Sequence, residues 1–145
     1  MEINQQNLLE IFEEVIQAFG EPFIWRWDEK HQALLTEFSR DKKELCLPKL
    51  QQFFPHEWNK KNIKQAPKEL KLPLGNLAKL TKEQLLFSKP SIGECPAIMA
   101  LWWPWGHGGT YSVRLVVLQN NYTVSTPQNK GWWASIKERF TADYL

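Results

Sequence analysis

Cysteine and long hydrophobic runs are both scarce in this chain, and each scarcity excludes a class of protein. Its 145 residues include two cysteines, Cys46 and Cys95, which lie 49 positions apart and outside any CxxC spacing. A disulfide-stapled scaffold is therefore excluded, and we expect two reduced thiols that act as small buried hydrophobes. The longest apolar run, residues 97–105, has nine residues and contains Pro104. Because a membrane-spanning helix needs about 20 apolar residues, no transmembrane segment is expected.

Sequence signals for secretion, metal binding and catalysis are also missing. Residues 1–15 lack a basic segment followed by an uninterrupted apolar stretch, so we expect no secretory signal and a cytoplasmic protein. His31, His56 and His107 lie outside the HxH, HxxxH and HExxH spacings of metal sites. Residues 106–109 contain the letters HGG, but the chain has no GxSxG elbow to supply an esterase nucleophile. We therefore expect no metal, no cofactor and no assignable catalytic residue, which favours a non-enzymatic protein over an enzyme.

What the chain does have is an ordinary globular composition with an unusual number of tryptophans. Hydrophobic residues make up 43% of the sequence and charged residues 23%, both close to globular averages. A chain of this length buries about two-thirds of its unfolded surface, which is enough for one domain over residues 1–145. A core of this size rarely needs eight tryptophans. The surplus is a reason to consider a binding role for some of them.

The net charge of +2 conceals a strong segregation of charge along the chain. Residues 1–41 carry nine acids and three bases, a net charge of −6. Residues 42–89 carry eleven lysines, no arginine and four acids, a net charge of +7, and residues 90–145 add +1. If the lysines share a face, they project a positive potential that steers an anionic partner. The alternative is that they are solvated and partly paired with the acidic N-terminal block.

The most basic polar stretch of the lysine-rich block lies around residues 56–64. We interpret Lys60, Lys61, Lys64 and Trp58 as candidate partner-binding residues. Aromatic side chains interleaved with lysines are typical of single-stranded nucleic-acid binders. Bidentate recognition of phosphate or guanine prefers arginine, however, and this block has none. An acidic protein is therefore the favoured partner, and nucleic acid is a less favoured one that stays open.

Helical periodicity occurs near both ends of the chain. Residues 5–19 repeat apolar side chains at spacings of three and four, and Gly20 follows as a stop signal. Residues 131–141 repeat large apolar side chains every four positions. We therefore expect an amphipathic N-terminal helix and a closing C-terminal helix.

Two hairpins are expected between these helices. Residues 23–27 and 33–38 are rich in aromatic and β-branched side chains and suit the arms of the first hairpin. Residues 97–105 and 110–118 suit the arms of the second, and both arms are apolar enough for central strands packed on two sides. Residues 122–125 suit a short edge strand.

Residues 47–96 form a proline- and lysine-rich insertion between the hairpins. They hold six of the nine prolines, so we expect short helical pieces joined by turns rather than long elements. Residues 48–54 suit a short helix with Pro48 in its first turn. Thr81 with Gln84 three positions later is typical of a capping box and predicts a helix over residues 85–87.

These elements together predict the α+β class. We expect a small antiparallel sheet of about four strands, an N-terminal helix, the mostly helical or irregular insertion and a C-terminal helix. Helices on one face of the sheet would leave the other face to the insertion or to a partner.

The end of the second hairpin concentrates aromatic side chains beside a glycine-rich turn. Strict alternation points Trp103 and Trp105 to one side of the strand and Trp102 to the other, and His107 lies in the turn. Indole rings combine a stacking surface with an N–H donor, so this cluster is a candidate ligand-binding site. The alternative is that the rings fill the core. Pro104 lacks a backbone donor and predicts an edge or a bulge here.

Three functions follow from these features. The leading hypothesis is a non-enzymatic interaction or accessory protein that presents a lysine-rich, aromatic-containing surface to an acidic partner. The second is a small-molecule binding protein or enzyme with a tryptophan-lined cleft at the hairpin end. The third is single-stranded nucleic-acid binding. Self-association through the opposite charge blocks is a further alternative.

Overall fold

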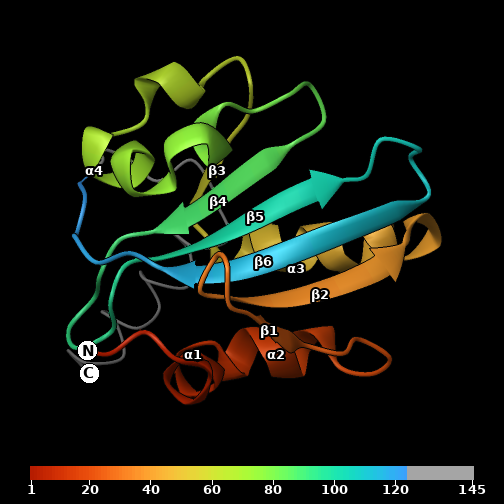
Figure 1. Cartoon of the computed structure of the whole chain (residues 1–145), viewed down its shortest axis with the longest axis horizontal. Helices are drawn as coiled ribbons and strands as arrows, with labels where there is room; N and C mark the ends of the chain where they lie inside the picture. The colour runs from red at the N-terminus through yellow and green to blue at the C-terminus, as the bar shows by residue number, and fades with distance from the viewer. Residues whose placement is uncertain (124–145) are drawn as a thin grey trace, which may run out of the picture.

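The computed structural model describes residues 1–123, and six strands of this part form one antiparallel sheet (Figure 1). The strands are β1 (Arg26–Asp28), β2 (Ala33–Ser39), β3 (His56–Trp58), β4 (Leu85–Lys89), β5 (Ile98–Pro104) and β6 (Thr110–Val117). Their order across the sheet is β1-β2-β6-β5-β4-β3. The α+β class is confirmed. The expected count of about four strands is too low, because β3 and β4 form inside the insertion.

The first hairpin forms with a shorter first arm than predicted. Pairing begins at Arg26, opposite Leu35, rather than at residue 23. Phe23 and Trp25 instead place their rings edge-on against Phe19, with ring centroids 5.3 and 5.4 Å apart. The aromatic side chains are therefore used for packing on a helix, where ring contacts need no strand ladder.

The second hairpin is the centre of the sheet, as the apolar character of both arms predicted. β5 pairs with β6 from Ile98 opposite Val117 to Pro104 opposite Tyr111. The Trp105 N–H donates to the Thr110 carbonyl at 2.8 Å, so alternation turns the Pro104 nitrogen away from β6. On that other side, the β4 ladder ends at Trp102. Pro104 therefore lies at a local edge and removes no ladder bond.

Three α-helices cover one face of the sheet. They are α1 (Gln5–Ile11), α2 (Glu13–Phe19) and α3 (Lys43–Phe53), and Figure 1 shows α3 behind the sheet and α1 with α2 along its β1–β2 side. The predicted N-terminal helix is thus two helices that meet at Phe12. Their buried side chains join those of the sheet in a first core, which includes Leu8, Phe12, Val15, Phe19, Leu34, Phe38, Val113 and Leu115.

The insertion contains the short helical pieces that its prolines predicted. They are the 3-10 turn η2 (Ile63–Gln65), the helix α4 (Lys68–Lys71) and the 3-10 segment η3 (Leu72–Ala78). Pro48 does not open a helix, because a 3-10 turn η1 (Arg40–Lys42) starts the helical path earlier and places Pro48 inside α3.

The helix predicted after Thr81 is wrong, although part of its capping signal is present. The Thr81 N–H donates to the Gln84 Oε1 at 2.9 Å, as in a capping box. Residues 85–89 nevertheless form β4, which pairs with β3 on one side and β5 on the other. Its Leu86 and Phe87 enter the two cores on opposite faces of the sheet, which a strand position allows.

The insertion covers the other face of the sheet over β3, β4 and β5 and reaches Val116 near the end of β6. A second core forms there, including Trp58, Leu70, Leu80, Leu86, Met99 and Leu101. Over β1, β2 and β6 the same face carries polar and charged side chains such as Arg26, Glu37 and Arg114.

Two sequence predictions fall at the C-terminal end. The helix expected over residues 131–141 lies outside the described residues, and so do residues 124–125 of the expected edge strand. Residues 122–123 are described and form no strand. In the part that the structure describes, no helix has the length and apolar character to cross a bilayer.

Candidate functional site: a basic surface and two cavities

The lysines predicted to bind a partner lie on an ordered turn at the surface. Lys60, Lys61 and Lys64 are all exposed. The turn that carries them is held by Asn59 and Asn62, because the Asn59 N–H donates to the Asn62 Oδ1 at 2.6 Å and the Asn62 N–H returns a bond at 3.0 Å. Side chains of this kind fix turns by replacing backbone partners. The lysines therefore extend from a defined backbone.

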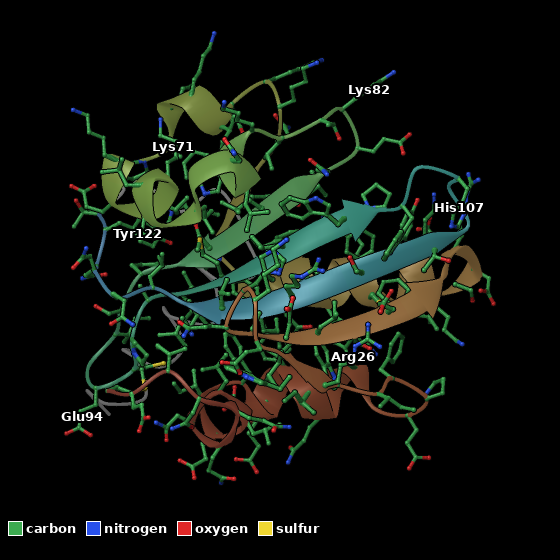
Figure 2. The ribbon with its side chains drawn as sticks, in the orientation of Figure 1. Arg26, Lys71, Lys82, Glu94, His107 and Tyr122 are labelled. Atoms are coloured by element: carbon green, nitrogen blue, oxygen red, sulfur yellow. The ribbon has the colours of Figure 1, made fainter. Side chains whose placement is uncertain are left out.

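Further exposed lysines on the insertion extend this group. We call the set the basic insertion surface; its members are Lys60, Lys61, Lys64, Lys68, Lys79 and Lys82. Figure 2 places Lys71 and Lys82 on the side of the molecule opposite the acidic helices α1 and α2. The acids of those helices, among them Glu10, Glu13 and Glu14, are exposed as well. The lysines of the insertion are thus separated in space from the acids of α1 and α2, whereas Lys43 and Lys49 lie on α3, which packs against α2.

No lysine of this surface forms an ion pair within residues 1–123. The described ion pairs are Arg26 with Glu37 and Arg114 with Asp28, and the His31 ring lies within hydrogen-bond distance of the same aspartate. The alternative that the lysines pair with the acidic N-terminal block is therefore not realised in that part of the chain.

Trp58 lies in the core and not beside the lysines at the surface. Its side chain is 2% exposed and belongs to the second core. Its Nε1 donates to the Ser88 Oγ at 2.9 Å, and its ring stacks on His56 with centroids 6.0 Å apart. In this position Trp58 anchors β3 beneath the insertion.

The aromatic residues at the hairpin end do not converge on one cleft. Trp102 is buried in the first core against Phe38 and Tyr111, whereas Trp103 packs on the opposite face against the second core. Trp105 is 48% exposed. His107 is exposed in the turn, where its Nδ1 accepts a hydrogen bond from the Gly109 N–H at 2.9 Å. The predicted alternation of Trp102 and Trp103 is correct, and it is the reason that they separate.

A cavity of about 450 Å³ does lie at this end of the sheet, and we call it the hairpin-end cavity. Trp102, Tyr111 and Gly108 line it, and so does Lys82 of the basic insertion surface. Arg40 and Lys43 add two cations, and Glu44 and Glu83 add two acids. Of the four ligand-binding residues predicted here, this cavity includes Trp102.

A charged cluster on the polar half of the sheet was not predicted. Asp28 on β1 accepts a hydrogen bond from the Arg114 Nε at 2.8 Å, and the His31 Nδ1 lies 2.8 Å from the same carboxylate oxygen. Burial by itself raises the pKa of Asp28, but the hydrogen bonds from Arg114 and His31 outweigh it and hold that pKa below its usual 3.8. The available signal was Arg114, a single charge in an otherwise apolar strand, which requires a carboxylate partner.

A second cavity, of about 420 Å³, lies beside this cluster. We call it the sheet-face cavity, because the β1–β2 turn, the insertion and the sheet surface enclose it. Its lining includes His31 of the turn, Leu74 and Leu77 of η3, and Met99 and Leu101 of β5. No sequence pattern pointed to it, since its walls come from five separate segments, the fifth being the N-terminal segment with Ile3.

The two cysteines differ in their environments. Cys46 is buried in the first core as predicted, and desolvation by that burial raises the pKa of its thiol to about 12. Cys95 is exposed, so the prediction of two buried thiols holds for Cys46 alone. Across residues 1–123, no three His, Cys, Asp or Glu side chains gather as a metal site would require.

Comparison with known proteins gives no match among family models, curated proteins or solved structures. The function is therefore inferred from the chain's own residues.

Proposed function

We propose that this chain is a non-enzymatic interaction protein that binds an acidic protein partner through the basic insertion surface. The observation that supports the proposal is the group of exposed lysines, none of which is ion-paired within residues 1–123. Unpaired like charges on one side of a protein produce a positive potential that accelerates the approach of an acidic partner.

The residue type also favours this kind of partner. The insertion supplies lysine and no arginine, and lysine acts as a flexible, strongly hydrated point charge. Such charges suit several carboxylates spread over a surface better than a phosphate held bidentately. The asparagine-held turn and the second core beneath it keep the surface ordered before binding, which lowers the entropic cost of association.

The proposal is tested by removing the positive charge of three lysines while keeping side chains of similar length. The variant K60Q/K61Q/K64Q is compared with K60R/K61R/K64R, which keeps all three positive charges. Poly-L-glutamate serves as the acidic probe and a single-stranded oligothymidylate as the nucleic-acid probe, each titrated by fluorescence anisotropy at low and at physiological ionic strength. We expect the glutamine variant to bind poly-L-glutamate about tenfold more weakly at low salt, since three exposed pairs contribute about 0.5 kcal/mol each.

The arginine variant should bind poly-L-glutamate as the natural chain does, and added salt should weaken both. Equal binding by the glutamine variant would contradict the proposal. Tighter binding to the oligothymidylate than to poly-L-glutamate would replace the acidic protein with nucleic acid as the partner. Association of the free chain with itself at low salt, seen by gel filtration, would indicate that its own acidic helices are the partner.

A second candidate function is small-molecule binding at the hairpin-end cavity. It is favoured by the combination of Trp102 and Tyr111 with the cations Arg40, Lys43 and Lys82 around one space. Aromatic walls and cations together suit a planar anion. Adenosine monophosphate is a suitable probe: quenching of tryptophan fluorescence that is lost in K43Q/K82Q would support this function, and no quenching would exclude it for that class of ligand.

A further inference from the structure

We propose that the sheet-face cavity is a binding site for a small amphipathic carboxylate, with an aliphatic body inside and the anionic group at the β1–β2 turn. This site is separate from the basic insertion surface and does not depend on the function proposed above.

The inner lining of the cavity is aliphatic. Met99 and Leu101 of β5 and Val116 of β6 form its sheet side, and Leu74 and Leu77 of η3 form the insertion side. The volume of about 420 Å³ falls in the range of about 300–1,000 Å³ in which proteins bind small ligands. An apolar lining of this size gains free energy by taking an apolar group out of water.

The polar groups of the lining select the sign of the ligand's charge. Lys30 and His31 belong to the lining, together with three residues whose side chains carry an amide, Gln32, Asn76 and Gln119. No lining residue is acidic. A cationic ligand would therefore find no counter-charge, whereas a carboxylate would find a lysine and several amide donors.

The polar side is held in place by the charged cluster behind it. Asp28 is 2.8 Å from the His31 Nδ1, and this contact fixes the orientation of the imidazole ring. Arg114 in turn holds Asp28 with its Nε at 2.8 Å, and its backbone is in register between Leu35 and Leu101. The two contacts, from Arg114 to Asp28 and from Asp28 to His31, therefore hold the His31 side chain in a defined position at the cavity wall.

The backbone of the turn is also tightly determined. Gln32 has φ +49°, which is uncommon for a residue other than glycine, asparagine or aspartate. Such conformations persist where the surroundings over-determine them, and they cluster at ligand sites. Lys30, His31 and Gln32 are thus presented to the cavity by a turn that departs from relaxed geometry.

The test uses three ligands that share one aliphatic chain: decanoate, decanol and decylamine, each below its aggregation concentration. Binding is measured by isothermal titration calorimetry on the full chain. We expect decanoate to bind more tightly than decanol, and decylamine to bind more weakly than either. In K30Q, decanoate should bind about tenfold more weakly while decanol is unaffected, because a hydrogen bond to a charged group is lost.

A pair of η3 variants locates the site. L74W fills the cavity and should abolish binding of decanoate, whereas L72W places the same ring on an exposed position of the same segment and should bind normally; Leu72 is 76% exposed and outside the lining. K49Q is the matched control for K30Q, since Lys49 is a partly exposed lysine of α3 that lies outside both the lining and the basic insertion surface. No binding of decanoate, equal binding of all three ligands, or unchanged binding by L74W would each overturn the proposal.

Discussion

At the scale of single residues, the polar half of the sheet offers two arginine–carboxylate pairs with different surroundings. Arg114 and Asp28 are both largely buried, with 21% and 13% of their side chains exposed. Arg26 pairs with Glu37 on the same face, but 66% of the Arg26 side chain is exposed. Water screens the Arg26–Glu37 pair more strongly than the Arg114–Asp28 pair, so the two pairs should differ in their contribution to stability.

Replacing Arg114 by methionine should lower the free energy of unfolding by about 1–3 kcal/mol at pH 7, because Asp28 keeps its charge and loses a buried donor. Asp28 has a lowered pKa in the folded chain, so its stabilising effect is present above its ordinary pKa of 3.8 and is lost as the pH falls through the lower folded value. The difference in the free energy of unfolding between R114M and the natural chain should therefore become smaller as the pH falls. Urea unfolding between pH 7 and pH 3 measures it.

The control is R26M, which removes the exposed arginine of the neighbouring pair. It should change the free energy of unfolding at pH 7 by less than about 1 kcal/mol. An R26M effect as large as that of R114M would mean that burial is not the deciding factor.

At the scale of elements, strand pairing and chain direction depend on a few backbone positions. Gly20 ends α2 with φ +66° and ψ −165°, a region that is essentially restricted to glycine. A Cβ there would lie 3.7 Å from the Gln17 carbonyl oxygen, an ordinary contact. The need for glycine is thus conformational rather than steric.

The variant G20A should therefore destabilise the fold by about 1–3 kcal/mol, measured by chemical denaturation. Gly106 is the matched control, since its φ is not positive and a Cβ added to it meets no atom within 4 Å. G106A should stay within about 0.5 kcal/mol of the natural chain. Equal effects of the two variants would show that the α2 terminus can relax.

At the scale of the whole molecule, the acidic helices and the basic insertion surface lie on opposite sides of one sheet (Figure 1). Because of this separation, we expect the lysines to contribute to binding a partner and not to the stability of the fold. Function and stability should then respond to different substitutions.

The variant K60Q/K61Q/K64Q should accordingly unfold within about 0.5 kcal/mol of the natural chain, because these exposed lysines form no ion pair within residues 1–123. Thermal unfolding followed by circular dichroism provides the measurement, on the same samples used for the binding titrations. A large loss of stability would show that the lysines support the fold, and the binding data would then need a variant that folds normally.

Local sequence patterns were sufficient to predict which side chains of a helix or strand are buried, because this depends on the period of that element alone. The 5–19 periodicity identified the buried face of α1 and α2, including Leu8, Phe12, Val15 and Phe19. Alternation placed Trp102 and Trp103 on opposite faces, and the apolar arms of 97–118 identified the central hairpin. Helical and strand periods involve residues that are close in sequence, so they can be read from the sequence directly.

Pairings between distant segments determined the rest. Residues 85–89 form the strand β4, despite the helix capping signal before them, because β3 and β5 pair with β4 on both of its edges. Trp58 lies in the second core, where Ser88, 30 positions away, accepts its N–H, and Asp28 pairs with Arg114 across 86 positions. The sheet-face cavity likewise needs the β1–β2 turn, η3, β5 and β6 together. Local preferences are worth a few tenths of a kcal/mol per residue, so burial and pairing in the assembled sheet override them.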